Sequence, residues 1–340
     1  MSSPSIVIVG AGVLGLSTAF ELKRRGHAVT VIDPGAPNAS RVAAGMVAPA
    51  MEAAIDDVSP DRAALFRTGR DLWPAFAAAS GVALARRPAE WRGGDVDAIA
   101  ARLLALGFMA RRDGYRVITD EDCQVEPDQA MAALRATLDD APDGAIIEGC
   151  ATGLRQVGDE WRIEVDGRAL AASAVVLATG TAAAISGTPE ATRILVDGVQ
   201  PIRGQIGLVA RDLTPHAVRG PGAYVAPMKG GAVIGATMEP GRRDTAPDAA
   251  VGERLTEAAW RVLGQAPEPL NIEWRAGVRG ASADGLPMAG AAPGGEGLFL
   301  ALAPRRNGWL LGPMVGAVVA DAIEGRTPSP EARALDPRRF

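Results

Sequence analysis

The segment SIVIVGAGVLGLSTAFELKRRGHAVTVID, residues 5–33, limits the fold of this chain more than any other part. Two apolar runs flank an amphipathic stretch, and this order predicts a βαβ unit with parallel strands. Between the first strand and the helix, Gly10 permits a tight turn, Gly12 lets a pyrophosphate approach the backbone, and Gly15 lets helix and strand pack closely. The pattern predicts a dinucleotide site, with the pyrophosphate at the helix N-terminus and the adenosine ribose on Asp33.

The composition narrows the class of protein. With 340 residues, 48% hydrophobic and 22% charged, the chain is long enough for about two globular domains. A net charge of −5 argues against a nucleic-acid partner. Two histidines, and Cys123 and Cys150 at 27 residues apart, predict no metal site and two reduced, buried thiols. The first 20 residues lack the basic region of a secretory signal and no apolar run could span a membrane, so we expect a cytoplasmic protein.

The α/β pattern occurs at both ends of the chain. The middle, from about residue 201, consists of strand-like segments separated by turn residues, as in an antiparallel sheet, whereas GLFLALA, PRRNG and WLLGPMVGAVVADAIEG return to strand, turn and helix. We therefore predict two interleaved domains in an α/β fold. The Rossmann-like nucleotide domain is predicted over 1–80, 117–196 and 274–340, and a smaller α+β substrate domain, built on a largely antiparallel sheet, over 81–116 and 197–273.

The glycine motif does not choose between NAD and FAD. A nicotinamide dehydrogenase commonly needs a positioned acid or base, and two histidines and two lysines leave few candidates. A second apolar strand with a glycine turn, VVLATG at 175–180, is predicted to end beside the same cofactor. From the residues alone, an NAD-dependent dehydrogenase and an ordinary strand and turn at 175–180 remain open alternatives.

Further blocks follow one another along the chain: SRVAAGMVAPAMEA, VEPDQAMAAL, VVLATG, PIRGQ, YVAPMKGGAVIGATME, WRAGVRGASADGLPMAG and RRNGWLLGPMVGAVVADAI. Together with the N-terminal segment, these blocks resemble the D-amino-acid oxidase superfamily of flavoproteins. Within this superfamily, the order of the blocks and their residues are most similar to those of the glycine oxidases of thiazole (thiamine) biosynthesis. The resemblance implies FAD as the cofactor.

The resemblance also implies roles for four side chains. It places Arg279 of GVRG on the substrate carboxylate, with the hydroxyl of Tyr224 assisting, Met238 as a wall of the substrate cavity, and Arg306 as a second arginine near flavin and substrate. A planar guanidinium suits a carboxylate, which it binds through two parallel hydrogen bonds. The alternatives are an internal salt bridge for either arginine, with Asp284 as a candidate partner, and plain packing for the tyrosine and the methionine.

The flavin site implied by the resemblance comprises Gly10, Gly12, Val13, Leu14, Gly15, Asp33, Ser40, Ala43, Ala44, Gly45, Met46, Thr179, Gly180, Arg279, Asn307, Gly308, Trp309 and Leu310. Two positions depart from the family pattern. Pro304 and Arg305 stand where the family often has histidine and an aromatic residue, and Gly280 stands where proline commonly follows the carboxylate-binding arginine. We expect these departures to alter the loop over the flavin.

The implied reaction is oxidation of the amine of glycine, sarcosine or a small D-amino acid. A hydride would pass from Cα to flavin N5, the imine would hydrolyse to an oxo acid, and oxygen would be reduced to hydrogen peroxide. Orientation is then the main catalytic contribution, and backbone N–H groups at the start of the terminal helix would face the charge that gathers on the reduced flavin. The alternatives are a dehydrogenase that uses a quinone or another acceptor, another amine substrate, and a non-catalytic FAD-binding subunit. Family members often form homo-oligomers.

Overall fold

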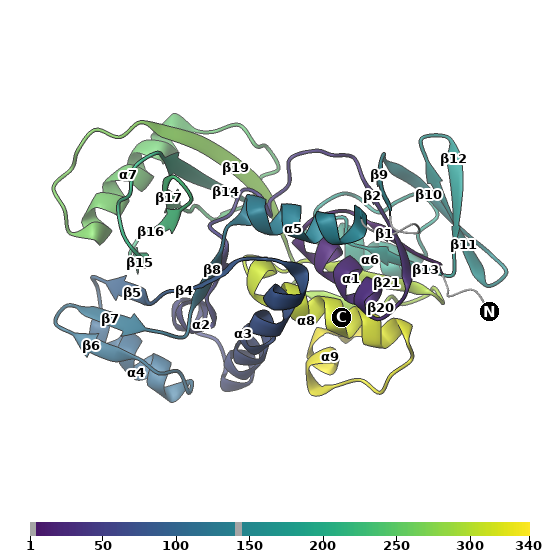
Figure 1. Ribbon diagram of the computed structural model, residues 1–340, viewed down its shortest axis with the longest axis horizontal. Helices are drawn as coiled ribbons and strands as arrows, with labels where there is room; N and C mark the ends of the chain where they lie inside the picture. The colour runs from purple at the N-terminus through teal and green to yellow at the C-terminus, as the bar shows by residue number, and fades with distance from the viewer. Residues whose placement is uncertain (1–4, 140–144) are drawn as a thin grey trace.

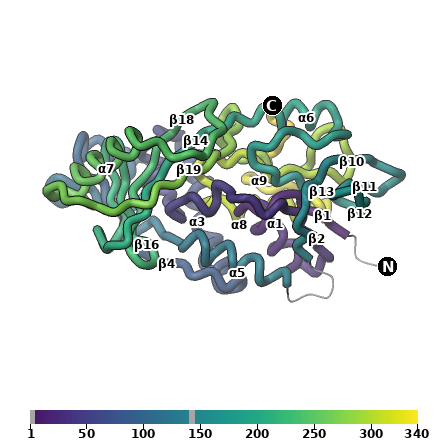
Figure 2. Tube along the Cα trace, turned by 90° about the horizontal axis from the view of Figure 1, so that it is seen from above, coloured from purple at the N-terminus to yellow at the C-terminus, as the bar shows by residue number. Residues whose placement is uncertain are grey.

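The computed structural model describes residues 5–139 and 145–340 and shows two large sheets side by side (Figure 1). Seen from above, the molecule is elongated, with α7 at one end, β10–β12 at the other, and β14 and β19 between them (Figure 2). Within these residues, no helix is both long and apolar enough to cross a bilayer.

The first sheet has six strands in the order β20-β21-β13-β1-β2-β9. All neighbouring pairs are parallel except β20 with β21. Strands from both ends of the chain therefore lie side by side, as the sequence predicts. Their bounds are β1 (Ser5–Val9), β2 (Ala28–Asp33), β9 (Ala145–Glu148), β13 (Ala174–Leu177), β20 (Met288–Ala291) and β21 (Leu298–Leu302).

Both faces of this sheet are covered. Ile6 and Ile8 of β1 point into a core shared with helices, whereas Val7 packs on the opposite face with Leu154 and Trp161. This is why the strand reads as a continuous apolar run rather than an alternating one. The helices are α1 (Val13–Arg24), α3 (Pro60–Ser80), α5 (Pro127–Asp139) and α8 (Gly308–Ile323), and the opposite face carries β10 (Ala151–Val157), β11 (Glu160–Val165) and β12 (Arg168–Ala172).

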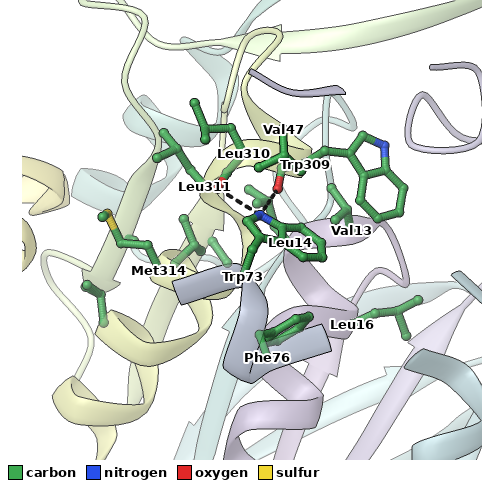
Figure 3. Close-up of a cluster of buried hydrophobic side chains, with 14 of the residues drawn as sticks. Val13, Leu14, Leu16, Val47, Trp73, Phe76, Trp309, Leu310, Leu311 and Met314 are labelled. Atoms are coloured by element: carbon green, nitrogen blue, oxygen red, sulfur yellow. Dashed lines mark hydrogen bonds between the residues drawn. The ribbon is translucent and has the colours of Figure 1, made fainter. Parts of the chain in front are cut away.

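The first turn of α8 is held by a tryptophan from α3 (Figure 3). The buried indole of Trp73 donates its Nε1–H to the carbonyl of Trp309 at 2.9 Å and faces that of Leu310 at 3.2 Å. The Trp309 carbonyl would ordinarily accept from the residue four positions on, but Pro313 has no N–H. Trp73 therefore satisfies a carbonyl that the proline leaves without a donor, and fixes where α8 begins.

The second sheet has nine strands and is antiparallel except where β5 meets β15. Its main order is β18-β14-β17-β16-β15-β5-β7-β6, and β19 pairs with β14 over ten residue pairs. Helix α7 packs on it through Val251, Leu255 and Trp260. The bounds are β5 (Ala89–Arg92), β6 (Arg111–Asp113), β7 (Arg116–Thr119), β14 (Gln200–Val209), β15 (Ala217–Gly220), β16 (Ala223–Met228), β17 (Gly231–Gly235), β18 (Glu239–Pro240), α7 (Ala249–Leu263) and β19 (Ile272–Ala281).

Shorter elements complete the fold. A three-stranded sheet has the order β3-β8-β4. The elements are β3 (Met46–Val47), α2 (Pro49–Asp56), β4 (Leu84–Arg86), α4 (Val96–Ala105), β8 (Cys123–Val125), α6 (Glu190–Asp197), α9 (Pro330–Leu335) and a short 3-10 turn at Pro337–Arg339.

The predicted fold class is confirmed: a Rossmann-like parallel sheet is interleaved with a largely antiparallel one. The domain division stays a proposal, and its boundaries at 116/117 and 273/274 run through β7 and β19. The expectation of two buried thiols is wrong for Cys150, which is exposed, while Cys123 is partly buried. Cys150 lies two residues after the end of β9 and lines the large cleft at the carboxyl ends of the parallel strands.

Candidate active site

One large cleft runs past the carboxyl ends of the parallel strands to β19 and the start of α8. Its volume of about 1460 Å³ exceeds the usual 300–1,000 Å³ of a pocket for one small ligand, so it has room for a dinucleotide and a second molecule. Thirteen of the predicted site residues line it: Gly10, Gly12, Val13, Leu14, Asp33, Ser40, Ala43, Thr179, Gly180, Arg279, Arg306, Gly308 and Trp309. Eight do not: Gly15, Ala44, Gly45, Met46, Tyr224, Met238, Asn307 and Leu310.

Steric crowding explains the glycines of the N-terminal motif. Gly10 has a φ of 109°, and a Cβ there would overlap the carbonyl oxygen of Ala178 in the turn after β13. A Cβ on Gly15 would overlap the Gly10 carbonyl and lie 3.2 Å from the Ala178 side chain. The two glycines therefore let the turn after β1 and the start of α1 pack against the turn after β13.

Two side chains hold the start of α1. Asp33 accepts a hydrogen bond from the backbone N–H of Ala11 at 2.6 Å, and the Ser40 hydroxyl accepts one from that of Val13 at 2.9 Å. Asp33 thus fixes the glycine turn, in addition to the ribose contact predicted for it. The N–H groups of Leu14 and Gly15, in the first turn of α1, have no acceptor within the helix and are available to an anion.

The start of α8 presents further free donors to the cleft. The N–H groups of Gly308 and Trp309, which line the cleft, and that of Leu310 behind them have no acceptor within the helix, and no side chain caps it. Two buried oxygens nearby, Thr179 Oγ1 and Asn307 Oδ1, have no hydrogen-bond partner among the described residues. Buried polar atoms normally have partners, so these fit a ligand with polar groups. The volume, the two helix N-termini and the unpartnered oxygens together fit FAD.

Arg279 differs from the other arginines of the cleft because it forms no ion pair among the described residues. Its guanidinium donates to the Thr237 carbonyl at 3.3 Å and contacts Met238 Sδ at 3.5 Å, and burial lowers its pKa from the ordinary value. No carboxylate in residues 5–139 or 145–340 forms an ion pair with it. The other five cleft arginines all have one: Arg41 with Asp128 at 3.8 Å, Arg135 with Asp33 at 3.6 Å, Arg275 with Glu273 at 2.7 Å, Arg305 with Asp56 at 2.6 Å, and Arg306 with Asp56 at 2.9 Å.

The candidate internal partner of Arg279 lies elsewhere. Asp284 pairs with Arg339 at 2.8 Å, near the C-terminus of the chain. The structure therefore leaves the Arg279 guanidinium free to bind an anion from outside the protein.

Two glycines make room for Arg279 and Tyr224. A Cβ on Gly204 of β14 would overlap the Arg279 guanidinium, and a Cβ on Gly235 of β17 would overlap the Tyr224 hydroxyl. Burial raises the pKa of Tyr224, against the smaller opposing effect of the Arg279 and Arg219 charges, so its hydroxyl keeps its proton at neutral pH. The hydroxyl is therefore a donor rather than an anion.

Arg306 forms an internal salt bridge, which was the alternative to a role beside flavin and substrate. Its Nε donates to Glu52, and its Nη2 lies 2.9 Å from Asp56 Oδ1. Glu52 also accepts from the buried Arg219 at 2.6 Å. Burial of Glu52 alone would raise its pKa, but the two arginines outweigh that effect and hold the pKa below its ordinary value. Arg306 lines the cleft, but as a paired cation.

The two departures from the family pattern lie next to each other in space. The Arg305 N–H donates to the Gly280 carbonyl at 2.8 Å, which joins the turn before α8 to β19. Ala303 and Arg305 in this turn have φ values of 61° and 52°, in the left-handed region. The turn is thus distinctly shaped and anchored to the strand that carries Arg279.

The sequence interpretation missed Glu52, Asp56 and Arg219, and the two glycines at 204 and 235. Glu52 and Asp56 are four residues apart, which places them on one face of α2, and that spacing was a usable signal. Their partners are 167 to 254 residues away in the chain, so no local pattern links them.

Comparisons with known proteins agree with this geometry. A family profile described as FAD dependent oxidoreductase (DAO) matches residues 5–322. A glycine oxidase of Pseudomonas putida is 29% identical over 96% of both chains. The crystal structure of a glycine oxidase from Geobacillus kaustophilus has a TM-score of 0.85 at 26% identity and covers 100% of both chains. An L-proline dehydrogenase from P. horikoshii shares the fold, with a TM-score of 0.82 at 17% identity.

These matches confirm the family resemblance drawn from the sequence and its cofactor. The chain belongs to the DAO family of FAD-dependent oxidoreductases.

Proposed function

We propose that this protein oxidises the amine of a small amino acid, namely glycine, sarcosine or a small D-amino acid. The product imine then hydrolyses to an oxo acid and ammonia or methylamine, and molecular oxygen takes up the two electrons as hydrogen peroxide. Support comes from the glycine oxidases that the chain is similar to over nearly its full length. It also comes from the charge arrangement in the cleft.

The observation that carries the proposal is the unpaired guanidinium of Arg279. A buried charge without a counter-ion is costly, and each of the other cleft arginines has a carboxylate of the protein within 4.0 Å. A substrate carboxylate on Arg279 supplies the missing counter-ion. The planar guanidinium can bind it through two parallel hydrogen bonds, which sets the orientation of the substrate as well as its position.

The residues around Arg279 complete the binding site in this proposal. The Tyr224 hydroxyl donates to the same carboxylate, and the Met238 side chain, which contacts the guanidinium, limits the space around Cα. FAD, when bound, would supply the hydride acceptor for oxidation of the amine. The N–H groups of Gly308, Trp309 and Leu310 stabilise negative charge at that end of the cleft. Holding the substrate in the reactive orientation is the main contribution of the chain.

The direct test is the visible absorbance spectrum of the purified, FAD-loaded protein without oxygen. Addition of glycine, sarcosine or D-alanine is expected to bleach the flavin bands, because oxidation of the amine reduces the cofactor. Flavin bands that none of the three amines bleaches would contradict the proposal and favour a non-catalytic FAD-binding role. L-Alanine serves as the control, because its Cα–H points the other way when the carboxylate and side chain are held in place.

The electron acceptor is tested by the same sample. Rapid return of the flavin bands in air, with formation of hydrogen peroxide, is expected of an oxidase. Slow return in air but fast return with a quinone would instead identify a dehydrogenase.

The likeness to glycine oxidases also suggests a role in supplying thiazole for thiamine, and growth of a deletion strain without added thiazole or thiamine would contradict that role.

A further inference from the structure

Three arginines meet around the substrate end of the cleft. Arg279, Arg305 and Arg306 all line it, and after the larger effect of burial the charges of the other two help to lower the pKa of Arg279. Three unpaired guanidinium groups would suit a ligand with two carboxylates. The pairing of Arg305 and Arg306 therefore decides how many anionic groups the site can accept.

Glu52 and Asp56 form ion pairs with both of these arginines. They lie one helical turn apart on α2, so their side chains leave the helix on the same face. Asp56 divides its two oxygens, with Oδ2 at 2.6 Å from Arg305 Nη1 and Oδ1 at 2.9 Å from Arg306 Nη2. Glu52 accepts from Arg306 Nε through Oε2. Two carboxylates thus balance two cleft-lining guanidinium groups.

The remaining cation of this cluster does not face the cleft. Arg219 donates to Glu52 Oε1 at 2.6 Å, is 5% exposed and is not among the lining residues. Its other acidic neighbour is the buried Asp122, whose charge helps to raise the pKa of Arg219 against the effect of burial. Arg219 therefore holds Glu52 in place from behind, and Arg279 is left as the unpaired donor at the substrate end.

A ligand with a second carboxylate would meet an unfavourable surface here. That carboxylate would lose its water without gaining an unpaired cation, and would lie near the negative charges of Glu52 and Asp56. A ligand with one carboxylate incurs neither cost. The difference requires no change in the volume of the cavity.

We infer that Glu52 and Asp56 are specificity-determining residues, because by pairing with Arg306 and Arg305 they restrict the site to amines that carry one carboxylate. This inference rests on the proposed function, since it assumes that Arg279 binds the substrate carboxylate. The acidic face of α2 then selects the substrate and does not only stabilise the fold.

The test compares two ligands that cannot be oxidised as amines. Butyrate and succinate have four carbons each, and succinate carries a second carboxylate where butyrate has a methyl group. Calorimetric titration of the FAD-loaded protein is expected to show succinate binding at least about ten-fold more weakly than butyrate. Equal affinity for the two ligands, or no binding of butyrate, would overturn the inference.

The main variant is Asp56→Asn, which frees positive charge on Arg305 and Arg306. Its side chain is 14% exposed, and it spares the contact between Glu52 and the buried Arg219. The affinity for succinate is expected to rise at least about ten-fold while that for butyrate changes less than about three-fold. A general structural defect would move both affinities together. An unchanged ratio in this variant contradicts the assignment.

Asp57→Asn is the matched control. It removes the same charge one residue further on, where the side chain is 77% exposed and pairs with Arg102 at 2.7 Å. Both affinities should remain those of the parent. The proposed function and this inference can fail separately: discrimination between the ligands without flavin bleaching by any amine removes the proposed function only, whereas bleaching without discrimination removes this inference only.

Discussion

At the residue scale, Arg279 is a buried cation on a strand, and we propose that it binds the substrate carboxylate. Its backbone is fixed by pairing of β19 with β14, and its guanidinium lies in space left by Gly204. Arg279→Ala is expected to raise KM for the amino acid by at least about 100-fold, corresponding to about 3 kcal/mol. The reason is that the substrate carboxylate loses its buried counter-ion, the guanidinium. The protein should stay yellow.

The control for Arg279→Ala lies on the same strand. Arg275→Ala removes an arginine that is already paired with Glu273 at 2.7 Å, and KM should remain that of the parent. Steady-state kinetics with glycine or sarcosine measure both variants. If Arg279→Ala kept full activity, the carboxylate would have to bind elsewhere.

Gly204 provides a second residue-scale prediction. In Gly204→Ala the new methyl group would overlap the Arg279 guanidinium, so the side chain must move out of its position. We expect KM to rise by about ten-fold and the free energy of unfolding to fall by about 1–3 kcal/mol, as in overpacked cores. Kinetics and urea unfolding measure the two effects. A parental KM in this variant would show that the guanidinium position seen here does not matter for binding.

Trp73 links two helices at the element scale. Trp73→Phe keeps most of the aromatic packing but removes the Nε1–H that satisfies the Trp309 carbonyl at the start of α8. The free energy of unfolding is expected to fall by about 1–3 kcal/mol, the cost of leaving a buried acceptor unpaired, and FAD should bind more weakly. Urea unfolding and FAD titration measure these changes.

The matched control is Trp91→Phe, because the Trp91 indole donates to the nearby Gly93 carbonyl in an exposed position. Its stability and FAD affinity should remain near those of the parent. Equal losses in the two variants would mean that the α8 contact has no special importance.

The limits of sequence interpretation also appear at the scale of elements. The unit from β1 to β2 and helix α8 follow from periodicity and glycine placement, and their observed bounds agree within one or two residues. Helix α2 was not predicted, because PAMEAAID is short and its small residues give no clear period. Nor does one sequence reveal which arginines are paired, since the partners of Arg306 and Arg219 lie far away in the chain. The unpaired state of Arg279 is visible only in three dimensions.

At the scale of the whole molecule, the free energy of unfolding depends on pH through a buried carboxyl group, that of Asp122. Burial raises the pKa of Asp122 to about 7, although its Oδ1 accepts from the Ala50 N–H at 3.0 Å; Oδ2 has no partner among the described residues. A carboxyl whose pKa is higher in the folded state than in the unfolded chain stabilises the fold at low pH, and that contribution is lost as pH rises from about 4 to 7. The wild-type protein therefore pays for this buried charge at neutral and higher pH.

Asp122→Asn tests this dependence. The amide keeps an acceptor for the Ala50 N–H but cannot ionise, so the stability advantage of the variant should grow by about 2–3 kcal/mol between pH 5 and pH 8. Urea unfolding at the two pH values measures it. Asp120→Asn, at an exposed carboxylate paired with Arg111, should show no such growth. A constant difference between Asp122→Asn and the parent would mean that Asp122 is already ionised at pH 5 in the folded protein.

The order of strands in the six-stranded sheet has a consequence for how the protein is made. β13 lies between β1, at residues 5–9, and β21, at residues 298–302, and the start of α8 follows only at residue 308. A chain emerging from the ribosome therefore exposes the glycine turn early but cannot complete the sheet until residues 298–302 have been translated. Until then the nascent chain keeps an open apolar strand edge, and the start of α8, which lines the cleft, is not yet available to hold the cofactor.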